Sequence, residues 1–267
     1  MPDDKRSLVD YMIQEHKISK RQACKAISLP LSTSAYRLKP KNDDAVIEQL
    51  NMLVDKHVNI GFWQSYYRIR RKGFIWNHKR LYRVYTKLQL NKRRKRKKRL
   101  PARLKQQLIK PTAINQVWSI DFMSDSLWNG RKFRLLNIVD DYNREVLHIE
   151  ADGSLPAMRV IRSLEYLKEF RGLPNMIRVD NGPEFISHQL ESWCTDNKIT
   201  LIFIQPGKPT QNAFVERCNG SIRRELLDAY VFNTITEVRD LAEMWREDYN
   251  CSRPHKSLGY VPPVEFI

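Results

Sequence analysis

The chain has 267 residues, and its 47 Lys or Arg against 30 Asp or Glu give a net charge of +17 and an isoelectric point near 9.8. An apolar fraction of 42%, with ten Phe, eleven Tyr and six Trp, excludes a disordered chain and is sufficient for a folded core. Charge of this sign and size favours an anionic polymer as the partner. We therefore expect nucleic acid rather than an acidic membrane face.

The basic residues are concentrated in one segment. Residues 56–120 contain twenty Lys or Arg and no acidic residue, so the rest of the chain holds 27 basic and 30 acidic side chains. Self-repulsion destabilises a compact state, and folding alone gives no reason for such segregation. A polyanion that neutralises the segment does give a reason.

The first 40 residues are predicted to form a small helical region. Periodic apolar residues predict a helix over 7–14, and Ser19 is a suitable N-cap for a second helix over 21–28. A further helical turn is expected over 32–37, after Pro30. This pattern is compatible with a helix-turn-helix and equally with a plain helical hairpin.

Residues 41–91 are predicted to form a second helical module that binds DNA, with helices over 44–57, 62–72 and 79–88. Its aromatic residues have the spacing of a small core rather than of base-stacking platforms. The Lys and Arg residues between them are then expected to face phosphates.

A basic linker is expected over 92–112. It begins with eight consecutive Lys or Arg residues at 92–99, a composition typical of a solvated, disordered arm that binds phosphates by counterion release. The DNA-contacting residues proposed in this arm are Arg94, Lys95, Arg96 and Lys97.

From residue 113 to residue 267 the pattern changes to alternating strands and helices. An antiparallel meander of three strands is followed by helix, strand, helix and strand, and then by two long helices. This order predicts an α/β fold of the RNase H-like type, with a mixed five-stranded sheet flanked by helices. The strands are expected at 117–123, 133–139, 145–151, 176–179 and 201–204, and the helices at 157–171, 188–198, 213–228 and 235–249.

Three carboxylates occupy positions that favour a metal site. Asp121 lies in the middle of an apolar strand, where an Asp is costly unless it is paired or binds a cation. Asp180 ends another apolar strand, and Glu216 lies on a predicted helix. Hard carboxylate oxygens suit Mg²⁺ or Mn²⁺, and two such ions would serve phosphodiester chemistry.

Each carboxylate also has a structural interpretation. Asp180 precedes Asn-Gly and is suited to start a turn, Glu216 is suited to a helix surface, and Asp121 to accepting a hydrogen bond from Ser119 or from a backbone amide. Asp140 and Asp141 compete as ligands, although the sequence Asp-Tyr-Asn-Arg is typical of a turn.

The segments around these carboxylates resemble the D, D and E blocks of retroviral-integrase-type transposases. The segments are Trp118-Ser-Ile-Asp-Phe-Met, Val179-Asp-Asn-Gly-Pro-Glu-Phe and Gln205-Pro-Gly-Lys-Pro-Thr-Gln-Asn-Ala-Phe-Val-Glu-Arg. Thirty-five residues separate Asp180 from Glu216, as in the D,D(35)E pattern. The residues over 61–85 and the tail over 248–263 are similar to the same second-frame (OrfB-type) proteins of the IS-three family, so the resemblance covers nearly the whole chain.

The resemblance implies a DNA transposase whose catalytic and metal-binding residues are Asp121, Asp180 and Glu216. Arg223 matches a basic residue that the family uses against DNA, and Asn212 shares the helical face of Glu216 and Arg223. Lys208, just before this helix, is a further proposed DNA contact. Gln211 departs from the Asp that is common at its position and leaves the triad spacing intact.

The resemblance also implies partners. These are the ends of an insertion sequence and a target DNA, further copies of the chain assembled on them, and an upstream-frame (OrfA-type) product, either separate or fused. Two other functions stay open: an RNase H-like nuclease without strand transfer, and a non-catalytic DNA-binding regulator.

The remaining residue counts bear on the cellular compartment. Cys24, Cys194, Cys218 and Cys251 form no CxxC pair, no apolar run has transmembrane length, and the first residues lack the apolar stretch of a signal peptide. We expect free thiols, no zinc module, no membrane segment and a bacterial cytoplasmic protein associated with the nucleoid.

Overall fold

The computed structural model describes residues 2–36, 42–91, 111–204 and 212–266. The chain divides into two compact units, Met1–Ala45 and Val46–Ile267. Two of the candidate DNA-contacting groups, Lys208 and the four residues Arg94, Lys95, Arg96 and Lys97, lie outside the described residues. Among the described residues, no helix is long and apolar enough to cross a bilayer.

The first unit contains three packed helices, α1 (Pro2–His16), α2 (Lys20–Ala26) and α3 (Leu31–Ala35). The predicted N-cap is confirmed, since the Ser19 hydroxyl accepts from the backbone N–H of Gln22 and the Gln22 side chain accepts from the backbone N–H of Ser19. Val9, Ala23 and Cys24 form the centre of its core. The third helix packs against both of the others, so this unit is more than a two-helix hairpin.

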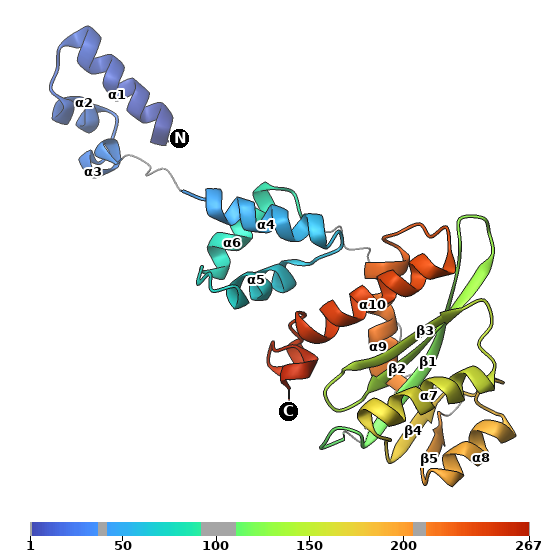
Figure 1. The fold of residues 1–267 in the computed structure, drawn as a ribbon. Helices are drawn as coiled ribbons and strands as arrows, with labels where there is room; N and C mark the ends of the chain where they lie inside the picture. The colour runs from blue at the N-terminus through green and yellow to red at the C-terminus, as the bar shows by residue number, and fades with distance from the viewer. Residues whose placement is uncertain (1, 37–41, 92–110, 205–211, 267) are drawn as a thin grey trace, which may run out of the picture. The chain divides into compact units, whose positions relative to one another are not determined.

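The second unit begins with a three-helix module (Figure 1). Its helices are α4 (Asp44–Lys56), α5 (Phe62–Arg71) and α6 (His78–Lys87), close to the predicted ranges. Val46, Leu50, Ile69, Leu81 and Val84 are buried between them, with the rings of Phe62, Tyr66 and Trp76 packed around this centre. The aromatic residues therefore build a core, as their spacing predicted.

The rest of the second unit is a five-stranded mixed sheet with helices on both faces (Figure 1). The strands lie in the order β3-β2-β1-β4-β5, in which β1, β2 and β3 are antiparallel and β4 and β5 run parallel to β1. The predicted RNase H-like sheet is confirmed. The strands are β1 (Val117–Ser126), β2 (Lys132–Asp140), β3 (Val146–Asp152), β4 (Met176–Val179) and β5 (Thr200–Phe203).

One face of this sheet is covered by α7 (Ala157–Arg171) and α8 (His188–Asp196), which bury Trp118 and Ile120 of β1. The other face is covered by α9 (Ala213–Ile222), the π-helical turn η2 (Arg223–Leu227) and α10 (Ile235–Cys251). Short 3-10 turns, η3 (Lys256–Leu258) and η4 (Pro263–Glu265), follow. Because side chains alternate along a strand, odd-numbered residues of β1 point to the α9 face.

The predicted single helix over 213–228 is only partly confirmed, because its last turn has π rather than α geometry. A π turn holds one more residue than an α turn, so side chains after Ile222 are rotated relative to an ideal helix. Leu226 and Leu227 of this turn are both buried. The four cysteines form no disulfide, and Cys24, Cys194 and Cys218 are buried.

Candidate active site on the α9 face of the sheet

The parallel pairing of β1 and β4 places two of the three carboxylates next to each other. Val117 pairs with Met176 and Ser119 with Arg178, and continuing this register by two residues brings Asp121 opposite Asp180. Both positions lie on the α9 face of the sheet, because their neighbours Ile120 and Val179 are buried against the other face. Two residues fifty-nine positions apart in sequence therefore share one edge of the site.

Glu216 reaches the same region from the first turn of α9. The helix is fixed on the sheet by Val215, Cys218 and Ile222, which are fully or almost fully buried. One turn after Glu216, the Asn219 side chain donates to Asp121 Oδ2 at 2.7 Å. This hydrogen bond ties the helix of the third carboxylate to the strand of the first.

The three carboxylates interact electrostatically. Burial raises the pKa of Asp121 from 3.8 to about 6. The hydrogen bond from the Phe122 backbone opposes this rise, and the negative charges of Asp180 and Glu216 add to it. Burial also raises the pKa of the Glu216 carboxyl. The predicted convergence of Asp121, Asp180 and Glu216 in one site is therefore supported by the negative charges of Asp180 and Glu216, which both act on Asp121.

A divalent cation fits the donor chemistry of this site, since it is lined by hard carboxylate oxygens whose repulsion a positive ion relieves. Among the described residues, no three Asp, Glu, His or Cys side chains are spaced as the ligands of one formed metal site. Magnesium is commonly held by one or two carboxylates together with substrate phosphates and water, so a closed protein cage is not required.

Because the pKa of Asp121 is raised, we predict that the free energy of unfolding of the metal-free protein depends on pH. Between about pH 4 and pH 6 the unfolded chain loses the Asp121 proton while the folded chain keeps it, so the free energy of unfolding falls as the pH rises. Asp121→Asn is expected to remove this slope and to raise the stability at pH 7 by up to about 3 kcal/mol. Urea unfolding of both proteins with EDTA, from pH 4 to pH 7.5, measures the difference. Parallel curves would contradict the prediction.

The loop after Asp180 is built to hold that carboxylate. Asp180 Oδ1 accepts from the backbone N–H of Gly182 at 3.0 Å, and a Cβ at position 182 would lie 3.0 Å from the same oxygen and 3.3 Å from Glu184 Oε2. Phe185 anchors the loop in the core by stacking on Phe122, and Glu184 pairs with Arg134. The conspicuous Asp-Asn-Gly-Pro-Glu-Phe sequence thus has a structural role at nearly every position.

Gly182→Ala is expected to displace the Asp180 carboxylate without unfolding the protein. A contact of 3.0 Å is too short for a methyl group, so either the loop or the carboxylate must move by a few tenths of an ångström. If Asp180 has the catalytic role predicted from the sequence, we expect the rate of DNA strand cleavage to fall about 10- to 100-fold, because such a shift misplaces its carboxylate. Gly130→Ala, at a position with no neighbour within 4 Å but a φ of +80°, controls for backbone strain. Equal loss in both variants would contradict the prediction.

Comparison with known proteins places this architecture in a family. The Integrase core domain family matches residues 111–209 and, in a second model of the same name, residues 197–263. The 31.7 kDa protein of insertion element IS407 from Burkholderia multivorans is 40% identical over 93% of this chain and 90% of its own length. The 39.2 kDa protein of IS476 from Xanthomonas euvesicatoria is 36% identical over 99% of this chain and 77% of its own length. The chain belongs to the insertion-element transposases that have an integrase core.

More distant proteins agree with this assignment. The putative transposase InsK of IS150 from Escherichia coli is 24% identical over 91% of each chain. Among solved structures, a chain of the simian T-cell lymphotropic virus intasome in complex with a PP2A regulatory subunit superposes with a TM-score of 0.53 at 21% identity, covering 60% of this chain and 56% of that one. This likeness confirms the RNase H-like fold. The transposase is accordingly a polynucleotidyl transferase that acts on DNA.

Two residues near Glu216, Arg223 and Asn212, are predicted to contact DNA and lie within the described part of the chain. In this transposase Arg223 has protein partners and Asn212 is buried. The Arg223 guanidinium pairs with Asp125 and donates to the Ser124 carbonyl at 2.7 Å, which links η2 to the end of β1. Asn212, the residue before α9, is 2% exposed. A contact with DNA stays a prediction for both residues, and for Asn212 it requires the start of α9 to open.

Asp140 and Asp141 are held away from the triad. Asp140 accepts from the backbone N–H groups of Asn115 and Tyr142, as expected for a turn. Asp141 is fully buried and its Oδ2 forms an ion pair with Arg178 at 2.5 Å. Arg178 lies two residues before Asp180 and points to the same face of the sheet. The ion pair of Asp141 and Arg178 therefore lies next to the triad on that face.

The helical module makes contacts with the catalytic core that the sequence did not predict. On α5, the side chains of Gln64, Tyr67, Arg68 and Arg71 lie on one face at helical spacing. The Arg68 guanidinium binds both oxygens of Asp248, and Arg71 pairs with Glu265. Tyr67 stacks on Tyr260 with ring centroids 3.7 Å apart. Carboxylates of the core thus hold both arginines in the structure described, and a contact with phosphates stays a prediction for them.

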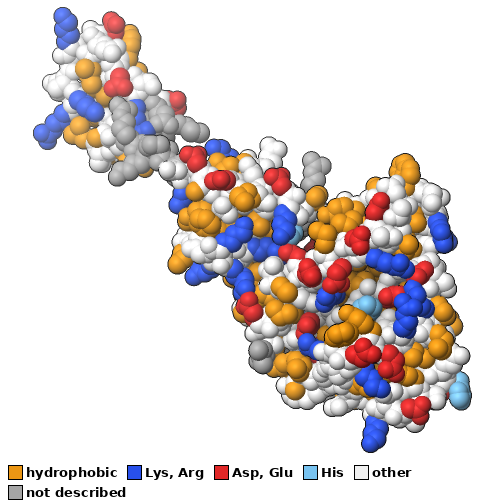
Figure 2. Space-filling model, viewed as in Figure 1, with side chains coloured by type: hydrophobic (Ala, Val, Ile, Leu, Met, Phe, Trp, Pro, Cys, Tyr) orange, Lys and Arg blue, Asp and Glu red, His pale blue; other side chains and the backbone are white. Residues whose placement is uncertain are grey.

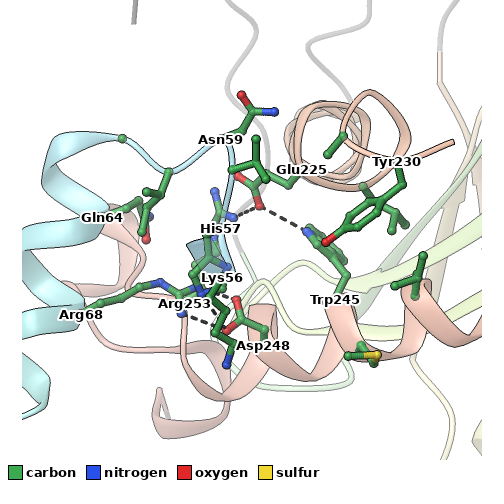
Figure 3. Close-up of a pocket in the computed structure, with 17 residues that line it drawn as sticks. Lys56, His57, Asn59, Gln64, Arg68, Glu225, Tyr230, Trp245, Asp248 and Arg253 are labelled. Carbon is green, nitrogen blue, oxygen red and sulfur yellow. Dashed lines mark hydrogen bonds and ion pairs between the residues drawn. The ribbon is translucent and has the colours of Figure 1, made fainter. Parts of the chain in front are cut away.

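A cavity of about 180 Å³ lies beside these contacts, between the α4–α5 connection and the segment from η2 to α10 (Figure 3). Its lining includes two ion pairs, Arg253 with Glu225 and Arg68 with Asp248. The rings of Tyr230 and Trp245 also line it, and the Trp245 indole N–H donates to Glu225 at 3.2 Å (Figure 3). It is distant in the chain from Asp121 and Asp180 and contains none of the triad. This cavity is therefore separate from the candidate active site.

Charge is mixed on the surface of the core. Figure 2 shows Lys and Arg side chains interspersed with Asp and Glu side chains over the face of the core that it presents. This agrees with the sequence, in which the basic excess is confined to residues 56–120. Most of the predicted electrostatic attraction for DNA therefore belongs to the segment before the core.

Proposed function

We propose that this transposase cleaves and joins DNA strands during movement of a bacterial insertion sequence, with Asp121, Asp180 and Glu216 as the catalytic and metal-binding residues. The proposal is carried by the register of β1 and β4, which brings Asp121 opposite Asp180 when it is continued by two residues, and by the charges of Asp180 and Glu216 that act on Asp121. The match to the Integrase core domain over this region supports it.

Mg²⁺ or Mn²⁺, as two ions, would activate the attacking oxygen and stabilise the leaving oxygen of the phosphodiester. The chain's own contribution is to hold carboxylate oxygens in fixed places. Gly182 N–H fixes one oxygen of Asp180, and Phe122 N–H and Asn219 fix the two oxygens of Asp121. Glu216 lies at the exposed side of the site, where a DNA phosphate approaches.

The proposed reaction has two similar steps without a covalent enzyme intermediate. Water attacks the phosphodiester at each element end and releases a 3′ hydroxyl, and this hydroxyl then attacks a phosphodiester of the target DNA. One set of carboxylates serves both steps, because each step forms one P–O bond and breaks another. We further propose that the chain assembles as a homo-multimer on two element ends, in an element of the IS-three family, together with an upstream-frame product.

The basic segment is proposed to supply affinity rather than chemistry. Lys and Arg residues that neutralise phosphates release counterions, so binding to DNA is expected to weaken steeply as salt increases. Exposed cations on α6, which include Lys79 and Lys87, belong to the described part of this segment.

The deciding experiment mixes labelled element ends, a target plasmid, Mg²⁺ and the purified chain, with and without the upstream-frame product. Joined products that require Mg²⁺ are the expected result. Cleavage without joining would overturn the proposal in favour of a nuclease. Equal activity of the wild type and Asp180→Asn would overturn it in favour of a non-catalytic regulator.

A further inference from the structure

Two buried asparagines lie directly beside Asp121. Asn137 on β2 pairs across the sheet with Asp121 on β1, so their side chains emerge next to each other on the α9 face. Asn219 lies above them on α9, three residues after Glu216. Asn137 is fully buried and Asn219 is 9% exposed.

The three side chains form a continuous hydrogen-bonded chain. Asn137 Nδ2 donates to Asn219 Oδ1 at 2.8 Å, and Asn219 Nδ2 donates to Asp121 Oδ2 at 2.7 Å. An ionised carboxylate only accepts hydrogen bonds, so Asn219 must present its NH₂ group to Asp121. Its carbonyl oxygen then faces Asn137, which must in turn donate. The orientation of both amides thus follows from the charge on Asp121.

The buried Asn137 side chain lowers the stability of the folded state. Its own Oδ1 is buried and has no hydrogen-bond partner among the described residues, which destabilises the folded state. The residues on either side of it, Leu136 and Ile138, are fully buried in the apolar core. An apolar side chain would suit the packing at position 137 at least as well, so the amide donor is what distinguishes Asn there.

We propose that Asn219 is a positioning residue that fixes the Asp121 carboxylate for metal binding, and that Asn137 orients the Asn219 amide. Asn219 contacts a proposed metal ligand and also shares a helix with Glu216, so it couples the placement of two carboxylates. The inference rests on the proposed function, since it assigns a role within the same site. Partners that orient a metal ligand commonly affect metal affinity or activity 10- to 100-fold.

The test compares Asn219→Ala, Asn137→Leu and the double variant with the wild type as full-length chains. Calorimetric titration with Mn²⁺, without DNA, reports metal affinity. Cleavage of labelled element ends at saturating DNA reports the rate, and filter binding with EDTA reports DNA affinity. We expect Asn219→Ala to weaken Mn²⁺ binding about 10-fold and to slow cleavage roughly 10- to 100-fold, with the Kd for DNA unchanged.

Asn137→Leu separates positioning from stability. It removes the donor and the unpartnered Oδ1 together, so its Tm is expected to stay within about 3 °C of the wild type while Mn²⁺ binding weakens. If Asn137 acts through Asn219, the double variant loses no more metal affinity than Asn219→Ala alone. Additive losses would overturn the role of Asn137.

Asn250→Ala provides a matched control at another buried Asn. The Asn250 side chain binds the backbone N–H and carbonyl of Val146, far from the triad in the chain. We expect this variant to lose stability and to keep wild-type Mn²⁺ affinity when measured below its Tm. Wild-type Mn²⁺ affinity in Asn219→Ala would overturn the inference. An inactive wild type that matches Asp121→Asn would instead overturn the proposed function, and the Mn²⁺ titrations would still decide the positioning role.

Discussion

Asp121→Asn, Asp180→Asn and Glu216→Gln are each expected to lower the rates of strand cleavage and joining by at least about 10³-fold, which corresponds to roughly 4 kcal/mol of transition-state stabilisation. Each substitution keeps the size of the side chain and removes the charge that a divalent ion requires. Because the three carboxylates act as one site, a variant that combines two substitutions should be little worse than either alone.

Measuring the Kd for DNA distinguishes a variant that has lost catalysis from one that no longer binds its substrate. Removing a negative charge from a surface that approaches phosphates should leave the Kd for DNA unchanged or slightly lower. Glu191→Gln is the matched control, since Glu191 is an exposed carboxylate on α8, which covers the opposite face of the sheet. Activity of Asp180→Asn within about tenfold of the Glu191→Gln control would contradict the assigned role.

The second large effect concerns the buried ion pair beside the triad. Asp141→Ala is expected to lower the free energy of unfolding by about 3–5 kcal/mol, because it leaves the Arg178 guanidinium buried without a counter-charge. Burial raises the pKa of Asp141 to about 6 in spite of the attraction of Arg178, so the pair itself contributes little net stability. Urea unfolding at pH 7.5 measures the loss.

The double variant Asp141→Leu with Arg178→Met tests this interpretation. Removing both charges avoids the uncompensated guanidinium, and the stability is expected to return to within about 2 kcal/mol of the wild type. If the double variant is as unstable as the single one, the loss reflects packing rather than charge. Mn²⁺ affinity should stay unchanged in every folded variant of this pair, because the described side-chain hydrogen bond of Arg178 is made to Asp141 and not to a triad carboxylate.

The sequence predicts the sheet well because its signals are local. Alternation of apolar residues defines β1, β2 and β3, and the predicted ranges differ from the observed strands by a few residues. The placement of Asp121 in a strand, Asp180 after a strand and Glu216 on a helix follows from the same local patterns. Their register follows from the fold that these elements build.

Other features depend on contacts between distant segments and leave no local signal. Arg68 and Asp248 are 180 residues apart, and nothing around either residue indicates that they pair. Asn137 and Asn219 are separated by 82 residues, and their roles depend on the orientation of two amides. A lone Asn inside the apolar run of β2 is the one signal available, since a buried amide needs a partner. The π turn after Ile222 likewise depends on how α9 packs.

The position of β1 as the middle strand has a consequence for the dynamics of the site. Local opening of a sheet begins at its borders, here β3 and the four-residue β5, whereas β1 lies in the middle, paired with β2 from Trp118 to Ser126 and with β4 from Val117 to Ser119. Amide hydrogens around Asp121 are therefore expected to exchange with deuterium only on global unfolding, while those of β5 exchange through fraying. The strand that carries the first carboxylate then keeps its geometry through thermal fluctuations that loosen the periphery of the domain.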